Sequence, residues 1–540
     1  MFSPTLLTSA SALCIPFLLL ATTDSDKASG AAGSGSPSHT LLTTGVGVGT
    51  GGESPLGTNL APLSHYSTQI AFKDLFEQAS RWYPQETTSY TWDTGQPIDL
   101  DADGWVRSLA TDQAAGVLLA RNLQGHYPAG EYTIRYQGTG VLEVHLDGAV
   151  SASQPGEMTV DVNPSDAGIH LKLVETDALD PMRNIQVLLP GFANDPLTEP
   201  FHPDFIALLR PFATIRLMGW QRTNEQSQRD WSDRVQPRDS RQTSDEGVAL
   251  EYMIDLCNQA DVDPWFCMPH EATDDYVTQF ATLVRNRLEP QLQPHIEYSN
   301  EVWNAIYPQG WYAQQQGVSL GLSTNAYQAQ LRFYSQRSVE IFDIWNVVYG
   351  AANDPLVPVL AGQSVNQWSA NQVLSWRSAF KKAEVYAVNA YFGRNLGLPD
   401  TMGDVQDWSL DQVFDALYDY IDDVTVDTYA NHRIAERAGL QLYSYEAGQH
   451  LVGVNNAVYN DQLTELFISA NKDSRMSALY SYALTRWREA GGTRYMHWNL
   501  LERYTRWGSW GSMEFMDDGA AGAPKYGALA RFAQNNPVWW

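Results

Sequence analysis

From Asn184 onward, short apolar segments alternate with longer segments of helical period, and this alternation limits the possible folds more than any other feature. Strands that alternate with helices predict a parallel sheet with crossover helices. With the helical segments between them, eight strands predict an α/β fold, a (β/α)₈ barrel, over residues 184–540. The expected strands are 184–191, 214–220, 264–270, 295–301, 355–363, 384–392, 440–446 and 493–499.

The residues before this barrel have a different pattern. Between 65 and 183, short alternating stretches such as GEYTIRYQG and GVLEVHLDG predict an all-β, sandwich-like domain. Residues 26–64 are rich in Gly, Ser and Thr and are expected to form a linker. The apolar run within residues 1–25 has the length of a signal-peptide core, although no Lys or Arg precedes it, so we expect a secreted protein.

The charge balance limits the possible partners. The chain has 34 Lys and Arg against 62 Asp and Glu, and its formal net charge of -28 repels nucleic acids and anionic membranes. The apolar run is too short for a membrane span. Since the spacing of a zinc or EF-hand site is absent from the sequence, we expect no metal and no cofactor. The sequence predicts no particular oligomeric state.

Two of the expected strands end in glutamate. The fourth ends in SNE with Glu301 and the seventh in YSYE with Glu446, and in a barrel both side chains would face one mouth. Two carboxyl groups at one cavity suit glycosidic cleavage, in which one protonates the leaving oxygen and the other meets the positive charge at the sugar carbon. Glu297 shares the strand face of Glu301 but lies deeper, so we expect a structural role for it.

These motifs resemble the clan A glycoside hydrolases, barrel enzymes with a catalytic acid at the end of strand four and a nucleophile at the end of strand seven. The resemblance implies that Glu301 is the general acid/base, that Glu446 is the nucleophile, and that Asn300 binds the 2-hydroxyl of the sugar. Three residues match clan positions near the substrate on strands two, six and eight, namely Arg216, Tyr391 and Trp498. The alternative interpretation is a buried counter-ion and two core aromatics.

Four further residues are predicted to bind the substrate. His270 ends the third strand in MPHEAT, where an imidazole either bonds a sugar hydroxyl, orients Glu301 or serves the structure alone. Trp303 follows Glu301, and Trp507 and Trp510 lie in the loop LLERYTRWGSWGSMEF after strand eight. Flat aromatic side chains in such loops are expected to stack on sugar rings, although aromatic residues also fill cores.

The sequence therefore predicts a secreted retaining β-glycoside hydrolase that cleaves a β-linked oligo- or polysaccharide, with β-glucan as the first expectation. A transglycosylase on the same scaffold is an alternative, because a sugar can capture the same glycosyl-enzyme. A second alternative is a non-catalytic glycan-binding surface protein in which the all-β domain binds the ligand. A barrel enzyme of unrelated chemistry is disfavoured, because the sequence has no phosphate-binding Gly loop after strands seven and eight.

Overall fold

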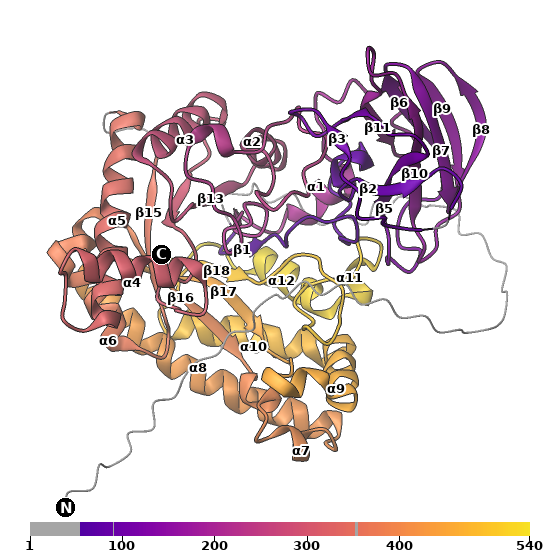
Figure 1. Cartoon of the computed structure of the whole chain (residues 1–540). Coiled ribbons are helices and arrows are strands. Elements are labelled where there is room, and N and C mark those ends of the chain that lie inside the picture. The colour runs from indigo at the N-terminus through magenta and orange to yellow at the C-terminus, as the bar shows by residue number, and fades with distance from the viewer. Residues whose placement is uncertain (1–53, 90, 351–354) are drawn as a thin grey trace, which may run out of the picture.

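The computed structural model describes residues 54–89, 91–350 and 355–540, which form two parts (Figure 1). A barrel surrounded by helices is the larger part, and an all-β domain lies beside it. The expected signal peptide, residues 1–25, and the first part of the expected linker, residues 26–53, lie outside the described residues.

A ring of eight parallel strands closes the barrel, which confirms the predicted fold. Each strand pairs with its sequence neighbours in the ring, and the first pairs with the last. In order around the barrel the strands are β1 (Leu56–Asn59), β12 (Thr214–Arg216), β13 (Asp263–Met268), β14 (His295–Tyr298), β15 (Val357–Gly362), β16 (Val385–Phe392), β17 (Gln441–Gln449) and β18 (Tyr495–His497).

The prediction of the first barrel strand is wrong. The apolar run 184–191 falls on β11 (Arg183–Leu188), which pairs antiparallel with β6 (Gly130–Gln137) in the all-β domain. The first barrel strand is β1, which lies inside the predicted linker 26–64. Its four residues are too few for a recognisable pattern, and an apolar run does not indicate which sheet it joins. The all-β domain is therefore inserted between the first and second barrel strands, and the barrel is not confined to 184–540.

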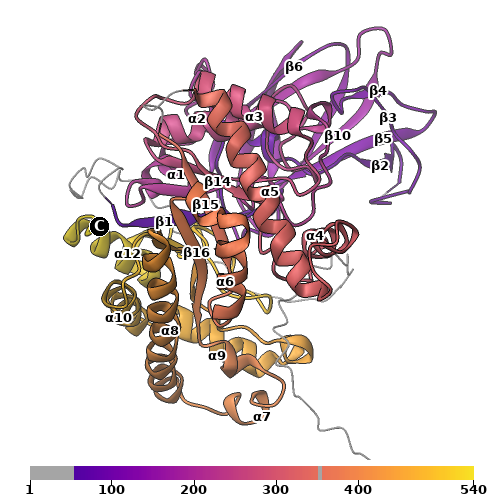
Figure 2. The same ribbon diagram turned by 90° about the vertical axis from the view of Figure 1, so that its left-hand side faces the viewer.

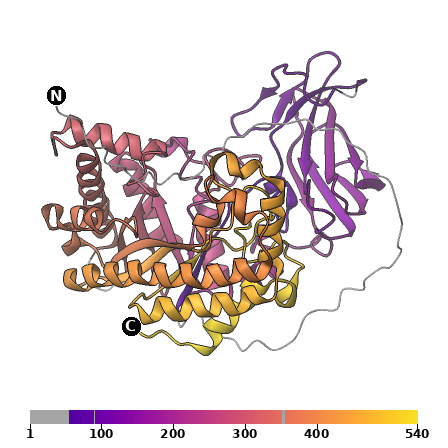
Figure 3. The same cartoon turned by 90° about the horizontal axis from the view of Figure 1, so that it is seen from below.

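Helices surround the barrel on its outside (Figures 2 and 3). The longest of those described, α8, is preceded by a capping box of Ser409 and Gln412 and is capped at its carboxyl end by Gly439, whose φ of 75° is left-handed. The α-helices are α1 (Pro203–Leu209), α2 (Leu250–Ala260), α3 (Asp274–Arg287), α4 (Pro308–Ser319), α5 (Ala326–Tyr349), α6 (Gln367–Ser375), α7 (Met402–Val405), α8 (Leu410–Ala438), α9 (Asp461–Lys472), α10 (Arg475–Glu489), α11 (Gly519–Gly522) and α12 (Pro524–Asn535). The 3₁₀ segments are η2 (Leu75–Gln78), η3 (Trp231–Asp233), η4 (Trp376–Lys382), η5 (Arg394–Gly397) and η6 (Asn455–Tyr459).

The inserted domain is built from two four-stranded antiparallel sheets, as the sequence predicted. One sheet has the order β2 (Tyr83–Glu86), β5 (Gln113–Leu119), β10 (Ile169–Thr176) and β7 (Gly140–Leu146), and the other has the order β11, β6, β9 (Glu157–Val162) and β8 (Gly148–Gln154). A small sheet of β3 (Asp99–Leu100) and β4 (Val106–Ser108) is attached. Ile169, Leu171 and Leu173 of β10 alternate into a core that is separate from the barrel core.

Side chains fill the interior of the barrel. An apolar cluster that includes Met218, Trp265, Tyr443, Tyr445 and Met496 lies inside the ring of strands. Because such an interior is packed, a substrate has access to the mouth at the carboxyl ends of the strands rather than to a channel. Among the described residues, the structure contains no helix with the length and apolar character of a membrane span.

Candidate active site

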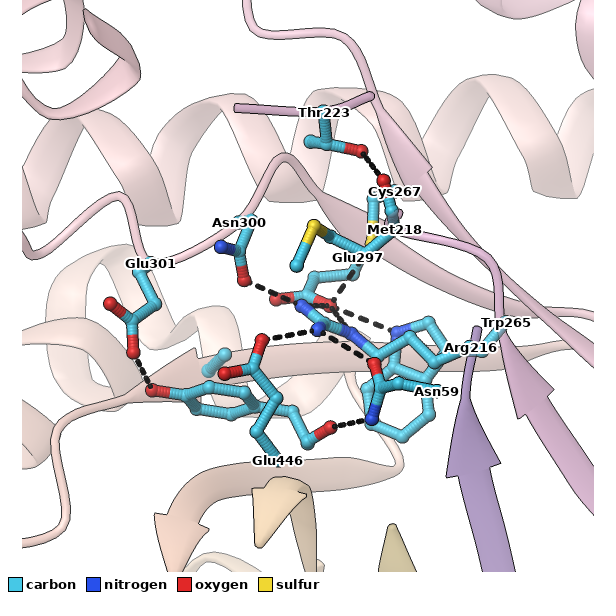
Figure 4. Close-up of polar contacts among 12 residues, drawn as sticks. Asn59, Arg216, Met218, Thr223, Trp265, Cys267, Glu297, Asn300, Glu301 and Glu446 are labelled. Carbon is cyan, nitrogen blue, oxygen red and sulfur yellow. Dashed lines mark hydrogen bonds and ion pairs between the residues drawn. The ribbon is translucent and has the colours of Figure 1, made fainter. Parts of the chain in front are cut away.

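Glu301 lies just beyond the carboxyl end of β14, Glu446 lies in the carboxyl-terminal half of β17, and the two are 5% and 7% exposed (Figure 4). Glu301 follows β14 in a turn where Ser299 and Glu301 have φ values of 58° and 42°. Positive φ is uncommon in residues other than glycine and is concentrated at functional sites. Glu446 lies in β17, directly after a register shift against β16.

Arg216 connects the residues of the site. It is fully buried on β12, the second strand of the barrel. Its Nη1 donates to Glu446 Oε1 at 2.9 Å, its Nη2 to Asn300 Oδ1 at 2.8 Å, and its Nε to Glu297 Oε2 at 3.0 Å. Nη1 also donates to Oδ1 of Asn59 at 3.3 Å, so Arg216 also contacts β1, the first strand of the barrel. Because the guanidinium is planar and its donors are fixed, it sets the positions of Glu446 and Asn300 relative to each other.

Glu297 lies inside the barrel, as the strand parity predicts. It is 1% exposed, it pairs with Arg216 at 2.9 Å, and it accepts a hydrogen bond from Trp265 Nε1 at 2.9 Å. Burial raises the pKa of Glu297, and Arg216 acts in the opposite direction. Because its Oε2 accepts from both Arg216 and Trp265, Glu297 is a structural anchor for Arg216.

Two groups in contact with Glu446 favour its ionised form and oppose the larger effect of burial. One carboxylate oxygen pairs with Arg216, and the other accepts a hydrogen bond from the hydroxyl of Tyr391 at 3.0 Å. Burial raises the pKa of Glu446, while Arg216 and Tyr391 lower it. A direct ion pair and a donated hydrogen bond both stabilise a carboxylate.

Glu301 is held by neutral groups instead. Tyr445 donates its hydroxyl hydrogen to Oε1 at 2.9 Å, and Asn304 Nδ2 donates to Oε2 at 3.1 Å. Burial first and the charge of Glu446 second raise the pKa of Glu301 to about 8. Since Glu446 has the cation in contact, a proton shared by the two glutamates resides on Glu301 near neutral pH.

Asn300 is bonded to protein groups on each side. Its Oδ1 accepts from Arg216, and its Nδ2 donates to Asn224 Oδ1 at 3.1 Å. Gln309 at the start of α4 donates to the same Asn224 oxygen at 2.7 Å and to the carbonyl oxygen of Asn300 at 2.8 Å. Asn300 is therefore rigidly placed beside Arg216, and its implied bond to a sugar hydroxyl stays a prediction.

Aromatic side chains lead outward from Glu446. The ring of Trp510 lies 5.9 Å from that of Tyr391, and its Nε1 donates to the carbonyl oxygen of Trp507 at 2.8 Å. The ring of Trp507 lies 6.3 Å from that of Tyr459. Trp507 and Tyr459 are 45% and 66% exposed. We call these four residues the aromatic row; it runs from the hydrogen-bond partner of Glu446 to the solvent.

The remaining predicted residues differ in their surroundings. Trp498 follows β18 and is half-buried against the cluster inside the barrel. Trp303 is 7% exposed in the apolar cluster between barrel and helices, so it does not extend an exposed stacking surface as expected. His270 is also buried, with its ring 5.4 Å from that of Tyr312 and its Nε2 3.7 Å from Glu271. Burial lowers the pKa of His270.

Within the described ranges, one group of side chains has ligand atoms close enough for a metal ion, namely His126, Asp517 and Asp518, within 4.8 Å of one another. Asp517 pairs with His126 at 2.8 Å. Asp518 accepts hydrogen bonds from the backbone N–H groups of Glu514 and Phe515. These contacts explain why the three side chains lie close together without a bound ion, so we assign no metal to them. The expectation that the reaction needs no metal or cofactor stays a prediction.

Asn59, Tyr445 and Asn304 are among the residues of the site that were not predicted from the sequence. Asn59 on β1 donates to the carbonyl oxygens of Tyr445 at 3.0 Å and His497 at 3.2 Å, which ties β17 to β18. Tyr445 and Asn304 are the hydrogen-bond donors to Glu301. Each of those two stands within three residues of a predicted glutamate, and a search of such neighbours is the signal that could have found them.

Comparison with known proteins supplies only distant likenesses. No protein-family model matches the chain, and no curated protein matches it. Among matching solved structures, the GH51 arabinofuranosidase from Xanthomonas axonopodis pv. citri is 14% identical with a TM-score of 0.38, over 62% of this chain and 66% of that chain. The GH5-4 broad specificity endoglucanase from Clostridium acetobutylicum is 11% identical with a TM-score of 0.34, over 62% and 89%. The endo-1,4-beta-D-mannanase from Thermotoga petrophila is 12% identical with a TM-score of 0.34, over 61% and 93%.

These three structures are glycoside hydrolases of different specificity. This chain spans just under two thirds of the arabinofuranosidase. At such identities and scores, neither a substrate nor a mechanism is transferred from them to this chain. The functional argument therefore rests on the side chains of the site.

Proposed function

We propose that this protein is a retaining β-glycoside hydrolase that acts on a β-linked oligo- or polysaccharide outside the cell. The observation that carries the proposal is the unequal surroundings of two buried glutamates at one barrel mouth. Glu446 contacts Arg216 and the hydroxyl of Tyr391, whereas neutral donors hold Glu301, whose pKa is about 8. Double displacement needs one carboxylate and one carboxylic acid.

In the first step, a carboxylate oxygen of Glu446 attacks the anomeric carbon while the proton of Glu301 moves to the leaving oxygen. The C–O bond to the leaving sugar breaks, and an ester between the remaining sugar and Glu446 forms. This ester removes the charge of Glu446, which is the second cause of the raised pKa of Glu301. The pKa of Glu301 therefore falls at the stage where it must act as a base.

In the second step, Glu301 removes a proton from water, and the water oxygen attacks the anomeric carbon. Glu446 leaves as a carboxylate and returns to its contacts with Arg216 and Tyr391. Two successive inversions retain the configuration of the sugar. Asn300 and Trp498 are proposed to bind the sugar at the point of cleavage, as the resemblance implies.

The aromatic row supports an extended substrate. Trp507 and Tyr459 lie farther along the row than Tyr391 and expose broad rings to solvent. Further sugar units of a chain supply flat faces for such rings. A soluble β-glucan is the first polymer to test.

The test is an assay of purified protein with a panel of β-glucans, mannans, xylans and galactans, in which released reducing ends are measured. Glu446→Ala and Glu301→Ala are expected to lose release from the same polymer. The control is Glu289→Ala, an exposed glutamate before the amino end of β14. Proton NMR of the first product is expected to show the retained anomer. Longer products in place of new reducing ends would indicate transglycosylation. The proposal is abandoned if no polymer is cleaved, or if both substitutions leave cleavage intact.

A further inference from the structure

Tyr445 reaches Glu301 because of an irregularity in β17. Val388 of β16 pairs with Ser444, but the next residue, Asn389, pairs with Glu446, so Tyr445 is an extra residue in β17. Consecutive side chains of a regular strand point to opposite faces, whereas a bulge changes this alternation. Tyr445 belongs to the cluster inside the barrel, and Glu446 contacts the buried Arg216 in the same interior. The bulge thus lets two consecutive side chains serve the site.

The hydroxyl of Tyr445 is in direct contact with the candidate acid. It donates to Glu301 Oε1 at 2.9 Å, and the side chain is fully buried. The guanidinium of Arg216 lies 5.3 Å from the centre of its ring. Burial and the charge of Glu301 hold the pKa of Tyr445 well above its usual range, so its hydroxyl keeps its own proton throughout the reaction.

The other oxygen of Glu301 is occupied by a group that only donates. Asn304 Oδ1 accepts a hydrogen bond from the backbone N–H of Ile306 at 3.2 Å, which fixes the orientation of the amide. Its Nδ2 therefore faces Glu301 Oε2, at 3.1 Å. Both oxygens of Glu301 therefore accept a hydrogen bond from a neutral donor, one from Tyr445 and the other from Asn304.

We propose that Tyr445 is a positioning residue that holds the Glu301 carboxyl group, through its contact with Oε1, in place for both halves of the double displacement. This inference rests on the proposed function. In the first half, the O–H bond of the Glu301 carboxyl group breaks, the proton forms a new bond to the leaving oxygen, and the carboxyl group becomes anionic. The Tyr445 hydroxyl donates a hydrogen bond to that carboxylate through Oε1. In the second half, the carboxylate takes a proton from water, and the hydroxyl again keeps its own.

Other groups also act on Glu301. The charged or titratable side chains that interact with it are Glu446, Arg216, Tyr391 and Tyr445. Glu446 disfavours ionisation of Glu301, and Arg216 favours it. Tyr445→Phe leaves both of those charges in place and removes one donor to the ionised carboxylate. Its effect on Glu301 is therefore separable from theirs.

The matched control is Tyr386→Phe. Tyr386 is a fully buried tyrosine of β16, and its hydroxyl has no hydrogen-bond partner among the described residues. Both variants remove one hydroxyl group from the barrel and keep the ring. Only Tyr445→Phe removes a donor to Glu301.

The kinetic test uses an aryl glycoside of the sugar that the assay above identifies. A hydrogen bond to a charged group stabilises that charge, so loss of the Tyr445 hydroxyl is expected to raise the pKa of Glu301. Tyr445→Phe is therefore expected to move the upper limb of the pH profile of kcat/KM to higher pH by about one to two pH units. The second step needs Glu301 as an ionised base, so kcat is expected to fall about tenfold. Because the glycosyl-enzyme then accumulates, KM is expected to fall as well. A profile that matches that of Tyr386→Phe would overturn the inference.

A second measurement does not depend on turnover. Carbon-13 NMR of labelled glutamate carboxyl groups, with Glu301→Gln used to assign the signal, gives the titration of Glu301 directly. Tyr445→Phe is expected to shift that titration to higher pH relative to wild type and Tyr386→Phe, and an unchanged titration overturns the inference. If no glycoside is cleaved by the wild type but the shift is seen, the proposed function fails while the contact between Tyr445 and Glu301 stands.

Discussion

The substitution Arg216→Met removes a cation that serves two buried carboxylates. Arg216 lies 2.9 Å from Glu297 and 2.9 Å from Glu446, and its side chain is 0% exposed. Removal of one partner from a buried ion pair costs about 3–5 kcal/mol, because the other charge stays buried without compensation. Since two carboxylates lose their partner here, we expect the free energy of unfolding at pH 8 to fall by an amount near the upper end, about 5 kcal/mol.

The loss is expected to depend on pH. Without Arg216, burial raises the pKa values of Glu297 and Glu446 further above those of the unfolded chain. At a pH above the ordinary pKa of glutamate, Glu297 and Glu446 then stay protonated in the folded variant, whereas both are ionised in the unfolded chain. Its stability therefore falls as pH rises, and the destabilisation at pH 5 is smaller than that at pH 8.

The assay is urea unfolding of wild type and variants, followed by tryptophan fluorescence at pH 5 and pH 8. The control is Arg238→Met, because Arg238 pairs with Asp103 at 2.8 Å but its side chain is 63% exposed. Exposed ion pairs contribute no more than about 1 kcal/mol. The electrostatic reasoning is refuted if the two variants lose equal stability at pH 8, or if the loss in Arg216→Met does not change with pH.

Three further substitutions test other parts of the structure. Trp507→Ala removes an exposed ring of the aromatic row, and the ratio of kcat/KM for a long oligosaccharide to that for an aryl monoglycoside is expected to fall about three- to tenfold. Trp92→Ala, at an exposed tryptophan of the all-β domain, is expected to leave this ratio unchanged. Burial and a neighbouring carboxylate raise the pKa of Glu77 well above its usual range, so stability falls as pH rises above that range. Glu77→Gln cannot ionise and is expected to raise Tm at pH 8 more than at pH 5, whereas equal shifts would contradict the linkage. A Cβ atom at Gly57 would overlap Met496, so Gly57→Val is expected to destabilise the barrel by about 1–3 kcal/mol in urea unfolding, and a neutral effect would argue against β1 as a barrel strand.

Local sequence patterns were sufficient to predict most of the barrel and the presence of two glutamates at its mouth, on the fourth and seventh strands. The alternation of strands and helices depends only on residues that are close together in the sequence, and it located the strands that carry or precede Glu301 and Glu446. A closed parallel barrel brings the carboxyl ends of its strands to one mouth, whatever the details of packing. The resemblance to clan A glycoside hydrolases placed Arg216 and Tyr391 near Glu446, and the structure brings both into contact with it.

The sequence by itself determined the alternation of elements and the residues at the strand ends, and the tertiary structure decided the rest. The four residues of β1 form a barrel strand because β12 and β18 pair with them, and their own pattern does not indicate this. Trp303 is buried because it belongs to the apolar cluster that residues of the barrel and of the helices form together. Tyr445 contacts Glu301 because an extra residue in β17 faces β16. Each of these outcomes depends on segments that are distant in sequence, and a local pattern does not specify its partner.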